Sequence, residues 1–231
     1  MTTRAGVIFD FDGVIVDSEE LQYLSYGEVL ARYGAGVTRE EYEREWIAAG
    51  LGPEYAVRRF SLPITPDELR RIKEPIYHEM LRTKARLIPG AAEAIERLAR
   101  DVPLAVASNS TAADIALVLD PFDLRRHFEA VVTREDYTGR KPAPDAFLTA
   151  AERLGLAPGL CVVIEDATKG VVAAERAGCP CIAIPNDFTR RNDFTGASMV
   201  LECFADVTTE LIMTLVRSRV HRQPTAGEGR T

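Results

Sequence analysis

The stretch GVIFDFDGVIVDSE, residues 6–19, decides how the rest of the chain is interpreted. It opens with four apolar residues, a run typical of a strand buried on both faces, and Asp10 and Asp12 follow directly. Side chains alternate along a strand, so these two carboxylates start on the same side. Two like charges so close are unfavourable unless a cation lies between them or one is protonated. The stretch therefore marks a candidate site, although a strand that ends in solvated aspartates would show the same sequence pattern.

Further apolar runs of the same kind alternate with segments of helical periodicity. The expected strands are 6–10, 104–108, 130–133, 161–165 and 181–184, and the expected helices between them are 91–100, 112–119, 144–154 and 169–177. Strands that alternate with helices favour right-handed crossovers and a parallel sheet. We therefore predict an α/β fold, a Rossmann-like parallel sheet flanked by helices.

Residues 18–86 interrupt this alternation. The segment is rich in Glu, Arg, Tyr and Leu, and it shows helical periodicity without a convincing strand. Thr38 and Thr65 have the position and residue type of helix starts. The pattern predicts an α-helical cap over 18–86, inserted into a core made of 1–17 and 87–216. The polar tail, 217–231, is predicted to be disordered.

Composition and charge indicate which kinds of partner and which cellular compartment to expect. The chain has 231 residues and a net charge of −7, without a run of Lys and Arg, which argues against nucleic acid. No apolar stretch approaches the roughly 20 residues that span a bilayer, and acidic residues follow too early for a signal peptide. The four cysteines lack C-x-x-C spacing, and we expect reduced thiols in a cytoplasmic protein. A soft-metal or redox role for Cys179-Pro180-Cys181 is the less favoured alternative.

A second strand ends in paired acids. The run CVVIED, residues 161–166, places Glu165 and Asp166 after four apolar residues. In a parallel sheet both acidic ends emerge at the carboxyl edge, where such folds bind ligands. Three or four carboxylates that converge there suit Mg²⁺, a hard cation that prefers oxygen ligands.

Two further segments complete the candidate site. Ser108 and Asn109 follow the strand at 104–107 and precede a helix, which is typical of an anion site but also of ordinary N-capping. Lys141 lies in a proline-stiffened loop, RKPAPD, residues 140–145. A lone lysine is usually a solvated surface group. A rigid lysine near clustered carboxylates and a phosphate would instead offset their charge.

Together these motifs resemble those of the haloacid dehalogenase superfamily. The segments D-F-D-G-V-I-V-D-S-E, S-N-S, K-P-A-P-D and I-E-D-A-x-x-G occur in this order between residues 6 and 207, and they most resemble the sugar-phosphatase and β-phosphoglucomutase-like branch. Any one of the four would be weak evidence, whereas the set is specific.

The resemblance implies a role for each residue. Asp10 would be the nucleophile that forms an aspartyl-phosphate, and Asp12 the general acid and base. Ser108, Asn109 and Lys141 would bind the transferring phosphoryl group. Mg²⁺ would be held by Asp10, Asp166 and the backbone carbonyl of Asp12, with Glu165 coordinating or close by. Ala167 replaces a serine frequent in the family, which predicts a modest loss of metal affinity.

The resemblance leaves more than one activity open. We predict a Mg²⁺-dependent phosphatase that acts on a small phosphate ester, with a sugar phosphate as the expected substrate. A phosphosugar mutase is the alternative, but Gln22 stands where such mutases have a histidine, and Gly50-Leu51-Gly52-Pro53 where they have a Ser-Arg pair. Gln22 and Gly52 are thus the cap residues expected to contact substrate. A catalytically silent binding protein is less favoured, because Asp10 and Asp12 are both present.

Overall fold

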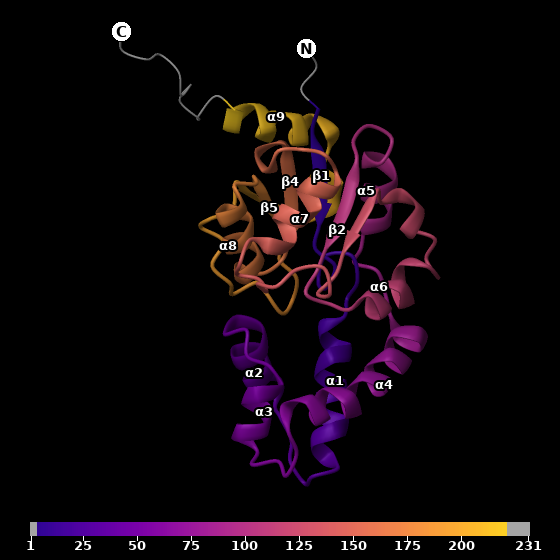
Figure 1. Ribbon diagram of the computed structural model, residues 1–231, viewed down its shortest axis with the longest axis vertical. Helices are drawn as coiled ribbons and strands as arrows, with labels where there is room; N and C mark the ends of the chain where they lie inside the picture. The colour runs from indigo at the N-terminus through magenta and orange to yellow at the C-terminus, as the bar shows by residue number, and fades with distance from the viewer. Residues whose placement is uncertain (1–3, 221–231) are drawn as a thin grey trace.

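The computed structural model describes residues 4–220 and consists of a helix-flanked sheet and a helical lobe at one end of it (Figure 1). All strand pairs are parallel, in the order β3-β2-β1-β4-β5-β6. The strands are β1 Gly6–Phe9, β2 Leu104–Ala107, β3 Ala130–Val132, β4 Cys161–Glu165, β5 Cys181–Ala183 and β6 Met199–Val200. The predicted α/β class and parallel sheet are confirmed.

Alternate side chains of β1 divide the core into two layers. Val7 and Phe9 pack with α5, α6 and α9 on one face of the sheet, whereas Ile8 packs with α7 and α8 on the other. All three are fully buried, and each large apolar side chain contributes about 1.5–3 kcal/mol. These helices are α5 Ala91–Leu98, α6 Ala112–Leu119, α7 Asp145–Arg153, α8 Thr168–Ala177 and α9 Thr209–Val220, with short 3₁₀ turns at Arg125–His127, Pro158–Leu160 and Phe204–Asp206.

Two elements at the end of the chain differ from the prediction. β6 was not expected, because two half-exposed residues carry no readable periodicity. The predicted disordered tail is wrong for residues 217–220, which continue α9. That helix is anchored because Ile212 and Val216 are fully buried against the sheet. Residues 221–231, the rest of the predicted tail, lie outside the described residues.

Residues 19–84, here called the helical cap, form helices joined by loops, and none of these described residues belongs to a strand. Thr38 and Thr65 are N-caps, as predicted, and Thr65 forms a capping box with Glu68. The helical cap has its own apolar core, in which Trp46 stacks on Tyr42. Its elements are α1 Glu19–Ala31, α2 Arg39–Tyr42, a π-helical turn Glu43–Ala48, α3 Pro53–Arg59 and α4 Pro66–Lys84.

Two linker segments join the helical cap to the sheet, and these segments pair with each other. Val16 bridges Leu87 in antiparallel fashion, and Ile15 accepts a hydrogen bond from the backbone N–H of Ile88 at 2.9 Å. Figure 1 shows the helical cap facing the end of the sheet where β1 leads into α1. The carboxyl ends of the strands therefore face the helical cap.

Two further properties concern the hydropathy of the helices and the state of the cysteines. Of the described helices, none is both long enough and apolar enough to span a bilayer. The four cysteines are unpaired with one another, and Cys161, Cys179 and Cys181 are buried. Burial raises the pKa of Cys161 to about 12, so this thiol is held protonated and unreactive.

Candidate active site

Three buried carboxylates meet at the carboxyl edge of the sheet. Asp10 follows β1, Glu165 ends β4, and β1 pairs with β4 in a register that sets Phe9 beside Ile164. Glu165 and Asp166 therefore emerge next to Asp10, and oxygens of all three carboxylates lie within 4.8 Å of one another. The structure thus brings together three of the four acids predicted as metal ligands.

Lys141 is placed inside this cluster. Its Nζ donates to Asp10 Oδ1 at 2.7 Å and to Glu165 Oε1 at 2.8 Å, and its side chain is 2% exposed. A third bond goes to the backbone carbonyl of Ala107 at 3.0 Å. Burial by itself lowers the pKa of Lys141, but Asp10 and Glu165 outweigh that effect and raise the pKa above its ordinary value. The lysine is therefore a fixed positive charge.

One lysine leaves three acids under-compensated. Burial, and then the charge of Glu165, raises the pKa of Asp10 to about 6 although Lys141 lowers it. Burial and the neighbouring Glu165 and Asp10 raise the pKa of Asp166 well above its ordinary value. Closely spaced carboxylate oxygens are the donors that hard divalent cations prefer. The donor set and its excess negative charge fit such a cation.

Glu165 is the most tightly held of the three. Besides Lys141, it accepts hydrogen bonds from the backbone N–H groups of Asp166 at 3.0 Å and Ala167 at 3.2 Å, both on Oε2. Gly170 makes room for it, because a Cβ at that position would lie 1.7 Å from Glu165 Oε1. With both oxygens engaged, Glu165 orients Lys141 and the loop after β4 as well as adding charge.

Asp166 is oriented from the other side. Asn186 Nδ2 donates to Asp166 Oδ2 at 2.8 Å and to the carbonyl of Gly13 at 3.2 Å. Gly13 has a φ of +75°, and a Cβ there would lie 2.3 Å from Asp166 Oδ2. Glycine is therefore required where the chain turns away from β1. Asn186 was missed from the sequence, although it lies just beyond β5, at the same edge of the sheet as the recognised acids.

Asp12 lies outside the acidic cluster and is held by hydroxyl groups. Its carboxylate accepts from Ser18 Oγ at 2.6 Å, Ser108 Oγ at 3.3 Å and Ser110 Oγ. Burial, followed by the charge of Asp10, raises the pKa of Asp12, while the hydroxyls of Ser110 and Ser18 lower it. A carboxyl group with a raised pKa beside a candidate nucleophile has the properties of a general acid and base. Ser18 and Ser110 were not singled out from the sequence as partners of Asp12.

The predicted phosphate loop is anchored at the same edge. Ser108 is fully buried, and its Oγ also accepts from the backbone N–H of Ser110 at 3.0 Å. Asn109 Oδ1 accepts from Tyr137 Oη at 2.8 Å and from the backbone N–H of Lys141 at 3.3 Å. These bonds tie the loop after β2 to the loop that carries Lys141.

The cavity above the nucleophile is small and covered by the helical cap. It measures about 30 Å³, and Asp10, Ser108 and Lys141 line it together with Ile47 of the helical cap. The contacts between the helical cap and the core include His78 Nε2, which lies 2.8 Å from Asp114 Oδ1, and Arg39, which stacks 4.3 Å from the centre of the Phe188 ring. The catalytic end of the site is therefore sheltered in this conformation.

Two charged residues that the sequence did not single out also line this small cavity. Glu19 begins α1 and accepts a hydrogen bond from Tyr42 Oη at 3.1 Å. Lys169 lies on α8; burial would lower its pKa, but Glu19 and Asp166 raise it. Both positions lie within the recognised motifs, Glu19 at the end of the first and Lys169 at an unspecified position of the last, so membership of those motifs was the available signal.

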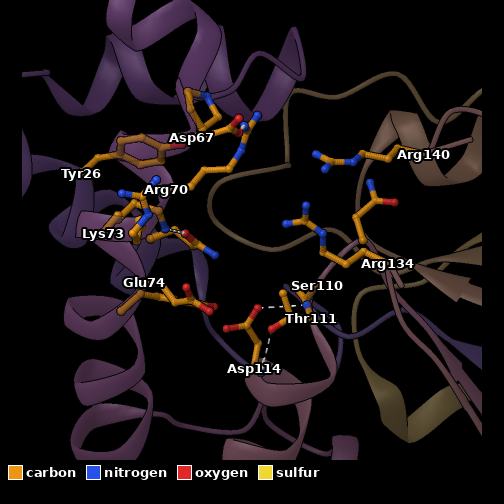
Figure 2. A pocket seen from close by; sticks show the side chains of 15 residues that line it. Tyr26, Asp67, Arg70, Lys73, Glu74, Ser110, Thr111, Asp114, Arg134 and Arg140 are labelled. Atoms are coloured by element: carbon orange, nitrogen blue, oxygen red, sulfur yellow. Dashed lines mark hydrogen bonds and ion pairs between the residues drawn. The ribbon is translucent and has the colours of Figure 1, made fainter. Parts of the chain in front are cut away.

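A larger pocket of about 540 Å³ adjoins the catalytic cavity, between α4 and the loops after β2 and β3 (Figure 2). Asn109 lines both spaces, which are therefore neighbours. Gln22 lines the larger pocket, where its Oε1 accepts from Lys73 Nζ at 2.5 Å. Gly52 is not among the residues lining it, whereas its neighbour Pro53 is. Lys73 was missed from the sequence; burial lowers its pKa to about 8 although acids nearby raise it.

Comparisons with known proteins identify the family. The model of the haloacid dehalogenase-like hydrolases matches residues 7–184. Protein CbbY of Rhodobacter capsulatus is 30% identical over 218 residues, 89% of this chain and 96% of the relative. The fructose-1-phosphate phosphatase YqaB of Escherichia coli is 32% identical over 186 residues, 78% of this chain and 96% of the relative.

A solved structure agrees with these matches. The CbbY protein of Rhodobacter sphaeroides, a mutant in complex with xylulose-(1,5)bisphosphate, superposes with a TM-score of 0.79 at 27% identity, over 88% of this chain and 96% of that one. The chain belongs to the haloacid dehalogenase-like hydrolase family. The family predicted from the four motifs is thereby confirmed.

Proposed function

We propose that this chain is a Mg²⁺-dependent phosphatase that hydrolyses a small phosphorylated metabolite, a sugar phosphate, through an aspartyl-phosphate intermediate. The observation that carries the proposal is the pairing of two differently held aspartates. Asp10 lies among charged groups, bonded to Lys141 at 2.7 Å, whereas Asp12 is held by neutral hydroxyls. A nucleophile needs neighbouring positive charge that keeps it ionised, whereas a group that gives and takes a proton needs neutral hydrogen-bond partners.

In the first half-reaction a carboxylate oxygen of Asp10 attacks phosphorus. A bond forms between that oxygen and phosphorus, and the bond from phosphorus to the ester oxygen breaks. Asp12 gives its proton to the departing oxygen, which leaves as an alcohol. Lys141 holds Oδ1 of Asp10, so the second oxygen of that carboxylate is the one that attacks.

In the second half-reaction water attacks the phosphorus of the aspartyl-phosphate. Asp12, now a carboxylate, takes a proton from that water, the bond between Asp10 and phosphorus breaks, and inorganic phosphate leaves. The Ser108 hydroxyl and the backbone around Asn109 bind phosphoryl oxygens in both steps. Their fixed position matters because reorganisation during the reaction would cost energy.

The metal site is proposed from the donor set. Asp10, Asp166 and the backbone carbonyl of Asp12 would hold Mg²⁺, with Glu165 alongside. The ion would neutralise charge between an anionic nucleophile and an anionic substrate. The oxygen-only donors favour Mg²⁺ over softer metals.

The names of the relatives support the substrate class. The relative from Escherichia coli is named for fructose 1-phosphate, and one from Thermotoga maritima, 33% identical over 182 residues, is named a phosphorylated carbohydrates phosphatase. The 540 Å³ pocket beside the nucleophile is within the range of small-molecule sites.

Phosphate release from a panel of sugar phosphates tests the proposal. Release should require Mg²⁺, stop in EDTA, and be lost in Asp10→Asn. Asp120→Asn, which removes an exposed carboxylate at the end of α6, is the matched control and should retain activity. Release that persists in Asp10→Asn would rule out the aspartyl-phosphate route. Isomerisation of β-glucose 1-phosphate without net release would favour the mutase instead.

A further inference from the structure

One side chain outside the recognised motifs is bonded to the acidic cluster and to the turn that meets the helical cap. Asn186 lies just beyond β5, whose pairing with β4 sets Ala183 beside Glu165. Its Nδ2 donates to Asp166 Oδ2 at 2.8 Å and to the carbonyl of Gly13 at 3.2 Å. Both hydrogens of the amide are thus engaged at the carboxyl edge of the sheet.

Both of these bonds affect oxygens that are proposed to hold the metal. Asp166 is itself a proposed ligand, and no hydrogen bond from residues 4–220 reaches its Oδ1, so that oxygen is available to a cation. Gly13 follows Asp12, whose backbone carbonyl is another proposed ligand. The bond to Gly13 therefore fixes the backbone next to that carbonyl. Asn186 does so as a hydrogen-bond donor, because an amide NH₂ group has no lone pair to offer a metal.

The oxygen of the same amide is bonded to the turn that follows. Asn186 Oδ1 accepts from the backbone N–H of Phe188 at 2.9 Å, and the backbone N–H of Asn186 donates to Thr189 Oγ1 at 3.0 Å. A flipped amide would set its oxygen against the Asp166 carboxylate and the Gly13 carbonyl, so the partners allow one orientation. The turn from Asn186 to Thr189 is therefore held together with the metal ligand.

Phe188 connects this turn to the helical cap. Its ring is buried in the apolar cluster that forms the core of the helical cap. Among the described residues of that cluster, Phe188 is the one that comes from outside residues 19–84. Arg39 of α2 stacks on the same ring at 4.3 Å. Movement of the helical cap away from the sheet would withdraw these partners, so the position of the turn depends on whether the helical cap is closed.

We propose that Asn186 is a positioning residue that couples cation binding at Asp166 to closure of the helical cap. The inference rests on the metal site of the proposed function. With the helical cap closed, Phe188 is anchored and keeps Asn186 where its Nδ2 orients Asp166. In the other direction, a cation bound to Asp166 fixes Asn186 and so favours the position of Phe188 on which the helical cap packs. Thermodynamic linkage makes the two effects equal in size.

Titration calorimetry of the whole protein with Mg²⁺ alone tests the positioning role. Asn186→Ala should weaken Mg²⁺ binding about 10- to 100-fold, the usual effect of removing a group that orients a metal ligand. Asn186→Leu keeps the volume without the hydrogen bonds and should weaken binding as much. Asp187→Asn changes an exposed neighbour in the same turn and should leave the affinity nearly unchanged. Wild-type affinity in both Asn186 variants would overturn the proposal.

The Mg²⁺ dependence of activity separates positioning from a loss of the fold. Asn186→Ala leaves every proposed reacting group in place, so a high Mg²⁺ concentration should restore most of its phosphate release. A loss that no Mg²⁺ concentration restores would assign Asn186 to the fold alone and refute its role as a positioning residue.

A double-mutant cycle tests the connection to the helical cap. Phe188→Ala should weaken Mg²⁺ binding about 2- to 30-fold in the otherwise unchanged protein, and have little effect in Asn186→Ala, where the connection is already broken. Phe122→Ala, which removes an exposed phenylalanine after α6, should change the affinity in neither background. Equal effects of Phe188→Ala in both backgrounds, or no effect in either, would refute the coupling.

A variant of the helical cap repeats this test from the opposite side. Arg39→Gln removes the group that stacks on Phe188. Loss of a positive charge by itself would strengthen the binding of a cation, so weaker Mg²⁺ binding in Arg39→Gln would report the coupling. Arg32→Gln, which removes another exposed arginine of the helical cap, is the matched control. Tighter or unchanged binding in Arg39→Gln would count against the coupling.

These binding measurements separate the inference from the proposed reaction, because they need no substrate. Mg²⁺ affinity that Asn186→Ala does not change would refute the inference even if the wild type releases phosphate. Mg²⁺ binding that depends on Asn186 and Phe188, in a protein that hydrolyses no phosphate ester, would instead refute the phosphatase and leave the coupling standing.

Discussion

Substitution of Gly170 by alanine is the sharpest test of how the acidic cluster is built. Gly170 lies in the first turn of α8, where alanine would normally be favoured by up to about 1 kcal/mol. Here the new Cβ would lie 1.7 Å from Oε1 and 1.8 Å from Cδ of Glu165, about half the distance of an ordinary contact. Glu165 must therefore leave its place.

The cost follows from what Glu165 would lose. It would give up the 2.8 Å bond from Lys141 and two backbone hydrogen bonds, all of them buried. Disruption of a buried ion pair costs about 3–5 kcal/mol. The helical preference of alanine offsets about 1 kcal/mol of this. The net loss should be about 2–4 kcal/mol, or a fall of about 5–15 °C in Tm for a chain of this size.

Thermal unfolding followed by circular dichroism measures this loss. Gly27→Ala provides the matched control, because Gly27 also lies in a helix and a Cβ there would meet nothing within 4 Å. Gly27→Ala should leave Tm unchanged or raise it, whereas Gly170→Ala should lower it and reduce phosphatase activity. If both substitutions raise Tm alike, Glu165 is not confined by Gly170 and its assigned role is wrong.

Three further predictions concern the reacting groups. Asp12→Asn should lower kcat about 10²- to 10⁴-fold for sugar phosphates. The loss should be smaller for p-nitrophenyl phosphate, because its leaving group needs no proton. Steady-state kinetics with both substrates measures this difference, and equal losses would count against Asp12 as the general acid. Lys141→Met should destabilise the protein by about 3–5 kcal/mol in urea denaturation, because Asp10 and Glu165 lose their buried counter-charge. The third prediction concerns the pKa of Asp10, which is raised from 3.8 to about 6 in the folded protein without metal, the state that EDTA maintains. Between these two pH values the folded protein holds a proton that the unfolded chain releases. Asp10 therefore stabilises the fold at low pH, and this contribution is lost as the pH rises through 6. Asp10→Asn should accordingly be more stable than wild type above pH 6 and similar to it near pH 4 by denaturation in EDTA; an unchanged difference across that range would contradict the assignment.

The central features of the fold and site could be predicted because they are local in sequence. The central strands are largely apolar runs, and Asp10 and Asp166 each follow a strand directly, so these two acids could be assigned to one edge of the sheet before any geometry was known. Lys141 was identifiable from its proline-stiffened loop, although its distances to Asp10 and Glu165 depend on the folding of separate segments.

What the sequence did not reveal depends on contacts between distant segments. Lys73 and Gln22 are separated by 51 positions, and Asn186 and Gly13 by 173, so no spacing rule connects them. Arg134 has the pattern of an ordinary loop arginine until the fold places it across a pocket from α4. The two-residue β6 lacks the length from which periodicity is measured.

The two neighbouring cavities have opposite excesses of charge. Around Asp10, three buried carboxylates have Lys141 in direct contact and Lys169 close by, and Glu19 adds a further acid, so an approaching phosphate would be repelled unless a cation is bound first. The larger pocket is lined by the cationic side chains of Arg70, Arg71, Lys73, Arg134 and Arg140 and by the carboxylates of Asp67, Glu74 and Asp114, so its lining has an excess of positive charge. Under the proposed function, a phosphate ester would therefore be attracted to the larger pocket and accepted at Asp10 only after a cation has bound there.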